Sequence, residues 1–307
     1  MYPPQPAEAW KRRRGAASNR GTICLVYAAV RQAGRIESEG ELVVGVTSID
    51  DMVFVLRFKE RDQLEVYDAV TFRLQRRLTV PDARGFTDMA SCEHNRCVYI
   101  ADHVDKYIHK LAGHLHKDNF TGWPIDDERG EPRGLSVNTA EPHNVLVACP
   151  SAGKIKEFST YGNIVRDIVL PRDVVNACHA RELPSGQLIV CHGDINDPVH
   201  GVSMISADGH ETVHSHGGQP GSDTDQYNVP RHLAADNKFV LVADINNRRV
   251  TLLSPTLDYI RDIVTAEQLK GDPMRLHLDA PRRRLYVADN ETRDGEYTTG
   301  SVVVFSV

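Results

Sequence analysis

The segment HETVHSH, residues 210–216, contains the pattern His-Glu-x-x-His. In zinc metalloproteases this pattern binds a metal, because histidines four residues apart on a helix share one face and both imidazoles reach a single ion. The glutamate then serves as general base. The chemistry therefore depends on whether residues 210–216 form a helix.

A second group of potential metal ligands lies in CHARELPSGQLIVCH, residues 178–192. Folded about the turn LPSG, this segment places Cys178 near His192 and His179 near Cys191, with the two pairs on opposite faces of a sheet. A structural zinc site needs four converging ligands. We therefore interpret these residues as packing residues of an inner hairpin and predict no metal here.

The elements that hold these residues are defined by an internal repeat. The segments PRGLSVNTAEPHNVLVACPSAGKIKEFS, PRHLAADNKFVLVADINNRRVTLLS and PMRLHLDAPRRRLYVADN each combine a short apolar strand, a polar turn and a strand ending near Ala-Asp or Ala-Cys. Weaker copies bring the number of units to six, and their equivalent positions are Gly45, Gly85, Gly134, His179, His232 and Arg275. Repeats with the spacing of these positions, each with four short strands, are typical of β-propellers.

We therefore predict an all-β, six-bladed β-propeller with four-stranded antiparallel blades. The blades are expected at about residues 36–81, 82–125, 126–171, 172–226, 227–269 and 270–307. The last unit has only three strands, so the apolar run TICLVYAAV, residues 22–30, is predicted to supply its outer strand and close the ring. Residues 1–21 are rich in Pro, Ala and basic residues and are predicted to be disordered.

In this fold HETVHSH belongs to the outer strand of the fourth blade, after the turn ADG. At about 3.3 Å per residue, His210 and His214 then lie roughly 13 Å apart, too far to share one zinc ion. We predict that Glu211 and its neighbouring histidines bind no catalytic metal.

Composition restricts the class of protein further. The chain has 307 residues, 41 % hydrophobic, with a net charge of −6 and no apolar run long enough to span a membrane. Its six cysteines are too few for a disulfide scaffold. We expect a cytoplasmic, monomeric domain. Secretion stays open because a basic segment precedes residues 22–30, and a disulfide between Cys92 and Cys97 stays open because they flank a short turn.

The fifth unit resembles the NHL repeat, in which a proline, an aliphatic strand, Val-Ala-Asp and Asn-x-Arg-Val recur. Asp244, Asn247, Arg248 and Val250 match this pattern, and Asp102 and Asp289 match part of it in other units. The resemblance implies a propeller that binds protein or RNA, as in TRIM-NHL proteins. Propellers with NHL repeats also include peptidyl-amidoglycolate lyase, whose zinc-binding histidines directly follow the first proline of the unit. In this sequence the equivalent residues are Arg133, Arg231 and Met274, so the zinc ligands of the lyase are not matched.

Basic residues recur where the innermost strand of each unit begins, and these strands run the same way along the channel. We predict that they gather at one mouth and bind an anion, either an acidic peptide or RNA, without a cofactor; paired acids between blades are the other interpretation. The predicted site residues are Arg84, Arg133, His179, Arg231, His232 and Arg275. The primary prediction is a non-catalytic binding or scaffold propeller with a protein partner. The alternative is a metal-dependent hydrolase or lyase, with Asp88, Asn138, Glu182 and Asp279 as candidates for a deeper calcium site.

Overall fold

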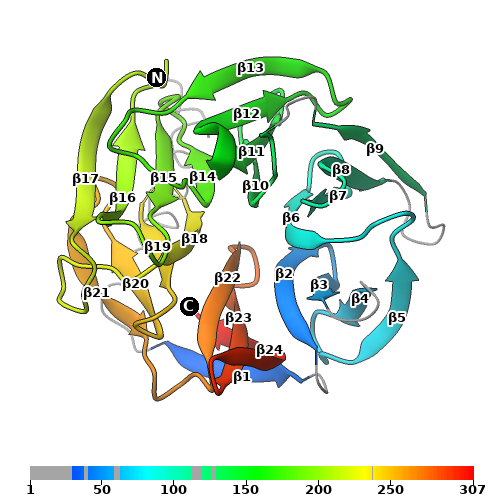
Figure 1. The fold of residues 1–307 in the computed structure, drawn as a ribbon. Coiled ribbons are helices and arrows are strands. Elements are labelled where there is room, and N and C mark those ends of the chain that lie inside the picture. Colours follow the sequence, from blue (N-terminus) through cyan, green and yellow to red (C-terminus); the bar gives the residue numbers. More distant parts are fainter. Residues whose placement is uncertain (1–29, 38–40, 59–62, 113–118, 126–128, 237) are drawn as a thin grey trace, which may run out of the picture.

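The computed structural model describes residues 30–37, 41–58, 63–112, 119–125, 129–236 and 238–307. They form a six-bladed β-propeller of four-stranded antiparallel sheets arranged around a central channel (Figure 1). The predicted fold class is confirmed. In the described residues a single 3-10 turn, Pro150–Ala152, is the one helical element, and none of these residues belongs to a helix of the length and apolarity needed to cross a membrane.

Each blade contributes four strands in chain order from the channel outward. Blades 1 to 3 consist of β2 (Leu42–Ile49), β3 (Met52–Phe58), β4 (Gln63–Asp68) and β5 (Leu74–Thr79); β6 (Phe86–Cys92), β7 (Cys97–Asp102), β8 (Tyr107–Ala112) and β9 (Phe120–Pro124); and β10 (Gly134–Val137), β11 (Val145–Cys149), β12 (Lys154–Phe158) and β13 (Ile164–Val169).

Blades 4 and 5 consist of β14 (His179–Glu182), β15 (Leu188–His192), β16 (His200–Ile205) and β17 (Thr212–Gly218); and β18 (Pro230–Ala235), β19 (Val240–Asp244), β20 (Arg249–Leu253) and β21 (Tyr259–Val264). Blade 6 combines β22 (Asp272–Asp279), β23 (Arg284–Arg293) and β24 (Glu296–Ser306) with β1 (Arg31–Ile36) from the other end of the chain.

Burial changes from the channel outward. The second strands, such as β11 with sequence VLVAC and β15 with LIVCH, are buried along their whole length. They are apolar on both faces because each blade packs a neighbour on either side. The outermost strands β5 and β13 are mostly exposed and carry Arg and Asp among their apolar residues.

An N-terminal strand closes the ring, as predicted, but it is formed by other residues than the predicted ones. β1 pairs antiparallel with β24, from Arg31 opposite Ser306 to Ile36 opposite Val302, so the first and last strands lie side by side (Figure 1). The closing strand is therefore residues 31–36 rather than 22–30, of which only Val30 is described. An outermost strand exposes one face to solvent, so the polar sequence RQAGRI can fill this position and an apolar run is not required.

The aspartates at the ends of the second strands have a structural role. Asp102 accepts hydrogen bonds from the backbone N–H groups of Arg84, Val104 and Asp105 at 2.7–3.1 Å. Asp289 accepts from the N–H groups of Lys270 and Gly271 and from the guanidinium of Arg35. These buried carboxylates satisfy turn amides and hold the connections between strands.

Candidate functional site

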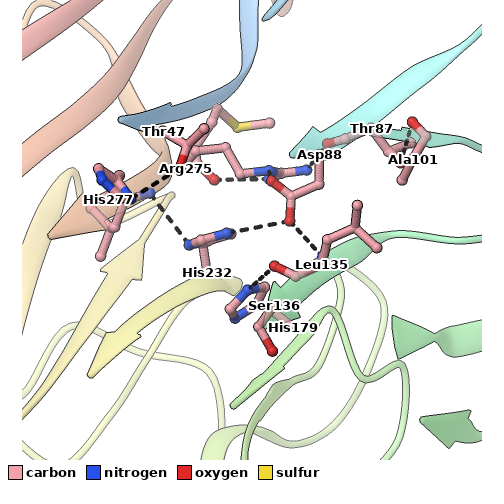
Figure 2. Close-up of polar contacts among 12 residues, drawn as sticks. Thr47, Thr87, Asp88, Ala101, Leu135, Ser136, His179, His232, Arg275 and His277 are labelled. Carbon is pink, nitrogen blue, oxygen red and sulfur yellow. Dashed lines mark hydrogen bonds and ion pairs between the residues drawn. The ribbon is translucent and has the colours of Figure 1, made fainter. Parts of the chain in front are cut away.

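β-Bulges at equivalent places in the innermost strands direct polar side chains toward the channel. The strand register shifts between Phe86 and Asp88, between Pro230 and His232, and between Pro273 and Arg275. A bulge re-aims the side chain that follows it. Asp88, His232 and Arg275 consequently converge from three blades (Figure 2).

These residues and His179 form a buried group that we call the central cluster. Asp88 accepts a hydrogen bond from Nε of Arg275 on Oδ1 at 3.0 Å and from the backbone N–H of Leu135 on Oδ2 at 2.8 Å (Figure 2). Nε2 of His232 lies 3.4 Å from Oδ2 of Asp88. The imidazoles of His179 and His232 stack with their centroids 3.8 Å apart. The cluster thus links blades 2, 3, 4, 5 and 6 at the axis of the propeller.

Asp88, His179 and His232 place one potential ligand atom each within 4.8 Å of the others, but a hydrogen bond gives His232 the wrong tautomer for a metal ligand. Nδ1 of His232 accepts from the N–H of Leu276 at 3.3 Å, so its Nε2 carries the proton and points it toward Asp88. The guanidinium of Arg275 adds a positive charge on the same carboxylate. The central cluster therefore fits an internal ion pair better than a cation site.

Burial determines the protonation of the cluster. Burial lowers the pKa of His232 and lowers that of His179 well below its usual value, so both imidazoles are uncharged at neutral pH. Burial on its own would raise the pKa of Asp88, but the positive charges near it lower this pKa to about 2. The lowering of the Asp88 pKa comes first from His232 and then from Arg275, whose guanidinium is the permanent charge beside this carboxylate.

A second polar layer connects the remaining blade. His277 lies within 2.8 Å of Oγ of Ser48 through Nε2 and within 3.3 Å of Oγ1 of Thr47 through Nδ1. Thr47 also donates to Oγ of Ser91 at 2.7 Å. Burial lowers the pKa of His277 to about 4. These contacts join blade 1 to blades 6 and 2, so all six blades meet through polar side chains near the axis.

Beyond the cluster, a cavity of about 670 Å³ opens toward the mouth at which the innermost strands end, here called the C-terminal mouth. This volume is in the range of small-ligand sites. Its walls include side chains of all six innermost strands, among them Thr47, Ser136, His232 and His277. Among the described residues, Arg181 is the arginine that lines it.

The side chain of Arg181 forms no hydrogen bond or ion pair with any residue in the described ranges, although the backbone of Arg181 pairs with Ile189 in the sheet. Asp236 is the residue whose charge acts on it most directly, and burial lowers the pKa of the guanidinium. An arginine stays protonated in proteins even so. The cavity therefore contains a positive charge with five N–H donors to offer to a ligand.

The residues predicted to form the mouth at which the innermost strands begin, the N-terminal mouth, have separate environments. Arg275, His179 and His232 are buried in the central cluster. Arg84 forms an ion pair with Asp105 on the surface, and Arg231 lies 3.6 Å from Oδ2 of Asp194 and 3.5 Å from Sγ of Cys178. Arg133 is exposed. Three of the four arginines thus have a carboxylate nearby, and anion binding at this mouth stays a prediction.

The other candidates from the sequence are also separated. The calcium candidates pair individually with other residues, namely Asp88 with Arg275, Asn138 with Glu157, Glu182 with Arg166, and Asp279 with Ser48 and Arg282. The motif HETVHSH lies on the outer strand β17, which begins at Thr212, while His210 is in the preceding turn. His179 pairs directly with Cys191 across β14 and β15, as expected, and Cys92 faces Cys97 as a free thiol.

Two cavity residues, Arg181 and His277, are not among the predicted site residues, although the sequence contains a signal for them. Arg181 is two residues after His179 on β14, and His277 is two residues after Arg275 on β22. Residues two apart on a strand share one face, so a channel-facing residue implies a second one farther along the same strand. The positions of Arg181 and His277 follow from those of the predicted residues.

Comparison with known proteins defines the fold and no more. The sequence matches no protein-family profile and no curated protein. Among solved structures, a streptogramin B lyase aligns with a TM-score of 0.61 at 12 % identity over 88 % of this chain and 97 % of that one. A catalytically inactive variant of virginiamycin B lyase from Staphylococcus aureus with quinupristin aligns with a TM-score of 0.62 at 10 % identity over 89 % and 98 %. The nidogen/laminin complex aligns with 0.60 at 10 % over 78 % and 85 %.

Proposed function

We propose that the protein is a non-catalytic binding propeller that receives an anionic group of a protein partner in its channel cavity. The observation that carries this proposal is the guanidinium of Arg181, which lies in the cavity without a hydrogen bond or ion pair to the described residues. A carboxylate can take two parallel hydrogen bonds from such a group. Among the similar structures, one is a complex of nidogen with laminin.

The cavity favours a peptide over RNA as the source of this anion. Single-stranded RNA is bound largely by stacking bases on aromatic side chains, including histidine. No Phe, Tyr or Trp is among the described residues that line the cavity, and four of its histidines already stack in pairs, His94 on His143 and His179 on His232. Ser136 and Asn138 add polar side chains of the kind that orient a ligand in a pocket. An aspartate side chain, a glutamate side chain or a C-terminal carboxylate supplies the required charge.

The experiment compares Arg181→Met with Arg293→Met. Arg293 is exposed at the end of β23, on the side of the propeller where β22 begins, opposite the C-terminal mouth. A pool of short acidic peptides is screened for binding to the natural protein by a rise in melting temperature, and hits are measured by titration calorimetry. We expect Arg181→Met to lower affinity at least tenfold and Arg293→Met to leave it unchanged, with affinity falling as salt increases.

Equal affinities for the natural protein and Arg181→Met would remove the proposal. An RNA oligonucleotide that binds equally well to both would place a nucleic-acid site elsewhere on the propeller.

A further inference from the structure

Two histidines and a glutamate meet at the rim of the C-terminal mouth, apart from the central cluster. His94 lies in the turn between β6 and β7 of blade 2, and Glu141 and His143 lie in the turn between β10 and β11 of blade 3. His94 and His143 are also among the residues that line the cavity. The group is thus formed where two neighbouring blades place their inner turns side by side.

The distances within this group match a metal coordination sphere. Nε2 of His94 lies 3.6 Å and Nε2 of His143 lies 3.5 Å from the same oxygen, Oε1 of Glu141. For metal–ligand bonds of about 2.0–2.2 Å, neighbouring ligands of a tetrahedral zinc ion are about 3.3–3.6 Å apart. All three ligand atoms lie within 4.8 Å of one another. The two histidine–glutamate separations therefore fit ligands of one ion, and the two histidine nitrogens lie within 4.8 Å of each other.

Hydrogen bonding gives His143 the tautomer that a metal requires. Its Nδ1 lies 3.1 Å from the backbone oxygen of Asn138. A carbonyl oxygen only accepts, so Nδ1 carries the proton and Nε2 keeps its lone pair, directed at Glu141. Metal-binding histidines commonly donate their other ring N–H to a backbone carbonyl in this way. His232 in the central cluster has the reverse arrangement.

The electrostatics also favour an ion. The imidazole of His94 stacks on that of His143 with centroids 4.4 Å apart and an angle of 27° between the rings, and both present Nε2 to one carboxylate. In the absence of an ion, the exposed His94 and Glu141 lose side-chain freedom in holding this geometry. A bound cation neutralises the negative charge of the Glu141 carboxylate and accepts the Nε2 lone pairs of His94 and His143.

We propose that His94, Glu141 and His143 bind a divalent transition-metal ion, with zinc as its ordinary occupant. Two imidazoles and a carboxylate suit zinc and its neighbours rather than calcium or magnesium, which prefer oxygen ligands. Three protein ligands leave a coordination position for water or for an atom of a ligand in the adjoining cavity. The proposal is independent of Arg181 and does not require the proposed partner.

The test uses the full chain, freed of metal by a chelator, and titrates it with Zn²⁺ alone by calorimetry. The variants are His143→Gln, His94→Gln and Glu141→Gln, and the control is the double variant His210→Gln/His214→Gln, which removes two exposed histidines of blade 4. We expect one Zn²⁺ per chain, a loss of affinity of at least tenfold in each of the three variants, and unchanged binding in the control.

Co²⁺ provides a second readout, because its visible absorption reports the coordination number and changes when a ligand is lost. We expect absorption bands of a four- or five-coordinate ion in the natural protein that disappear in His143→Gln. Circular dichroism and the melting temperature without metal verify that the variants fold. Zn²⁺ binding that is unaffected by all three variants, or that is no stronger than millimolar in the natural protein, overturns the proposal.

Discussion

The guanidinium of Arg275 and the carboxylate of Asp88 form a buried ion pair between blades 6 and 2, with Nε 3.0 Å from Oδ1. The two residues are 187 positions apart in the sequence. Arg275 also donates to the backbone oxygens of Thr87 and Met274. This pair joins the innermost strands of blades 6 and 2.

The ion pair provides the first prediction. Arg275→Met leaves the buried carboxylate of Asp88 without its counter-charge, and we expect the free energy of unfolding to fall by about 3–5 kcal/mol. Arg84→Met, which breaks a surface pair with Asp105, is the control and should leave the urea midpoint almost unchanged. The double variant Asp88→Asn/Arg275→Met should be more stable than Arg275→Met alone. If Arg275→Met unfolds at the same urea concentration as Arg84→Met, the pair has no structural role.

The second prediction concerns ring closure. A chain that begins at Val30 keeps every described contact of β1, whereas a chain that begins at Glu37 lacks the whole strand and leaves β24 as an exposed edge. We expect the longer chain to melt like the full protein and the shorter one to melt at a lower temperature and to aggregate. The substitution Arg35→Met, which removes contacts to Asp289 and Ser301, should have an intermediate effect. Equal melting curves for the two truncated chains would falsify closure by β1.

The third prediction is a dependence of stability on pH. Burial lowers the folded-state pKa of His179 and His232, and lowers that of His192 and His277 to about 4. Between the unfolded value near 6.5 and these lower values the unfolded chain binds more protons, so stability is complete above about pH 6.5 and is lost as the pH falls toward 4. Each histidine contributes a slope of up to about 1.4 kcal/mol per pH unit.

Urea unfolding at pH 7.5, 6.0 and 5.0 measures this slope. His277→Gln cannot be protonated, so its stability should change less steeply over the same range, although hydrogen bonds to Thr47 and Ser48 are altered at every pH. Parallel pH profiles for the natural protein and His277→Gln would show that this imidazole is equally basic in the folded and unfolded chains.

The fourth prediction separates the two interpretations of the N-terminal mouth. Arg231→Glu places a second negative charge near Asp194 and should lower the melting temperature, because the side chain of Arg231 is only 16 % exposed. Arg133→Glu alters an exposed residue and should not. If this mouth binds anions, Arg133→Glu weakens the binding of an acidic peptide in a salt-dependent manner. If Arg133→Glu binds the acidic peptide as well as the natural protein does, the arginines of this mouth have a structural role only.

Several features follow from short stretches of sequence. Apolar strands ending in Val-Ala-Asp or Tyr-Val-Ala-Asp predict the blades, since each blade depends on contacts within a few dozen residues. The position of HETVHSH beside and on the outer strand β17 follows equally from the turn ADG and the strand after it. The closing strand lies later in the sequence than the predicted residues 22–30, because a polar edge strand can fill a position for which the pattern predicts an apolar one.

The sequence by itself therefore determined the six blades, their antiparallel order and the inward direction of alternate residues on the innermost strands. Only the tertiary structure decided which of the inward-facing charged side chains have a partner of opposite charge. Arg275 is matched by Asp88, whereas Arg181 has no ion-pair partner among the described residues and His94 meets His143 across two blades. Strand patterning follows from local hydrogen bonding and the period of two, but compensation of charge depends on distances of a few ångströms between residues brought together only when the ring closes.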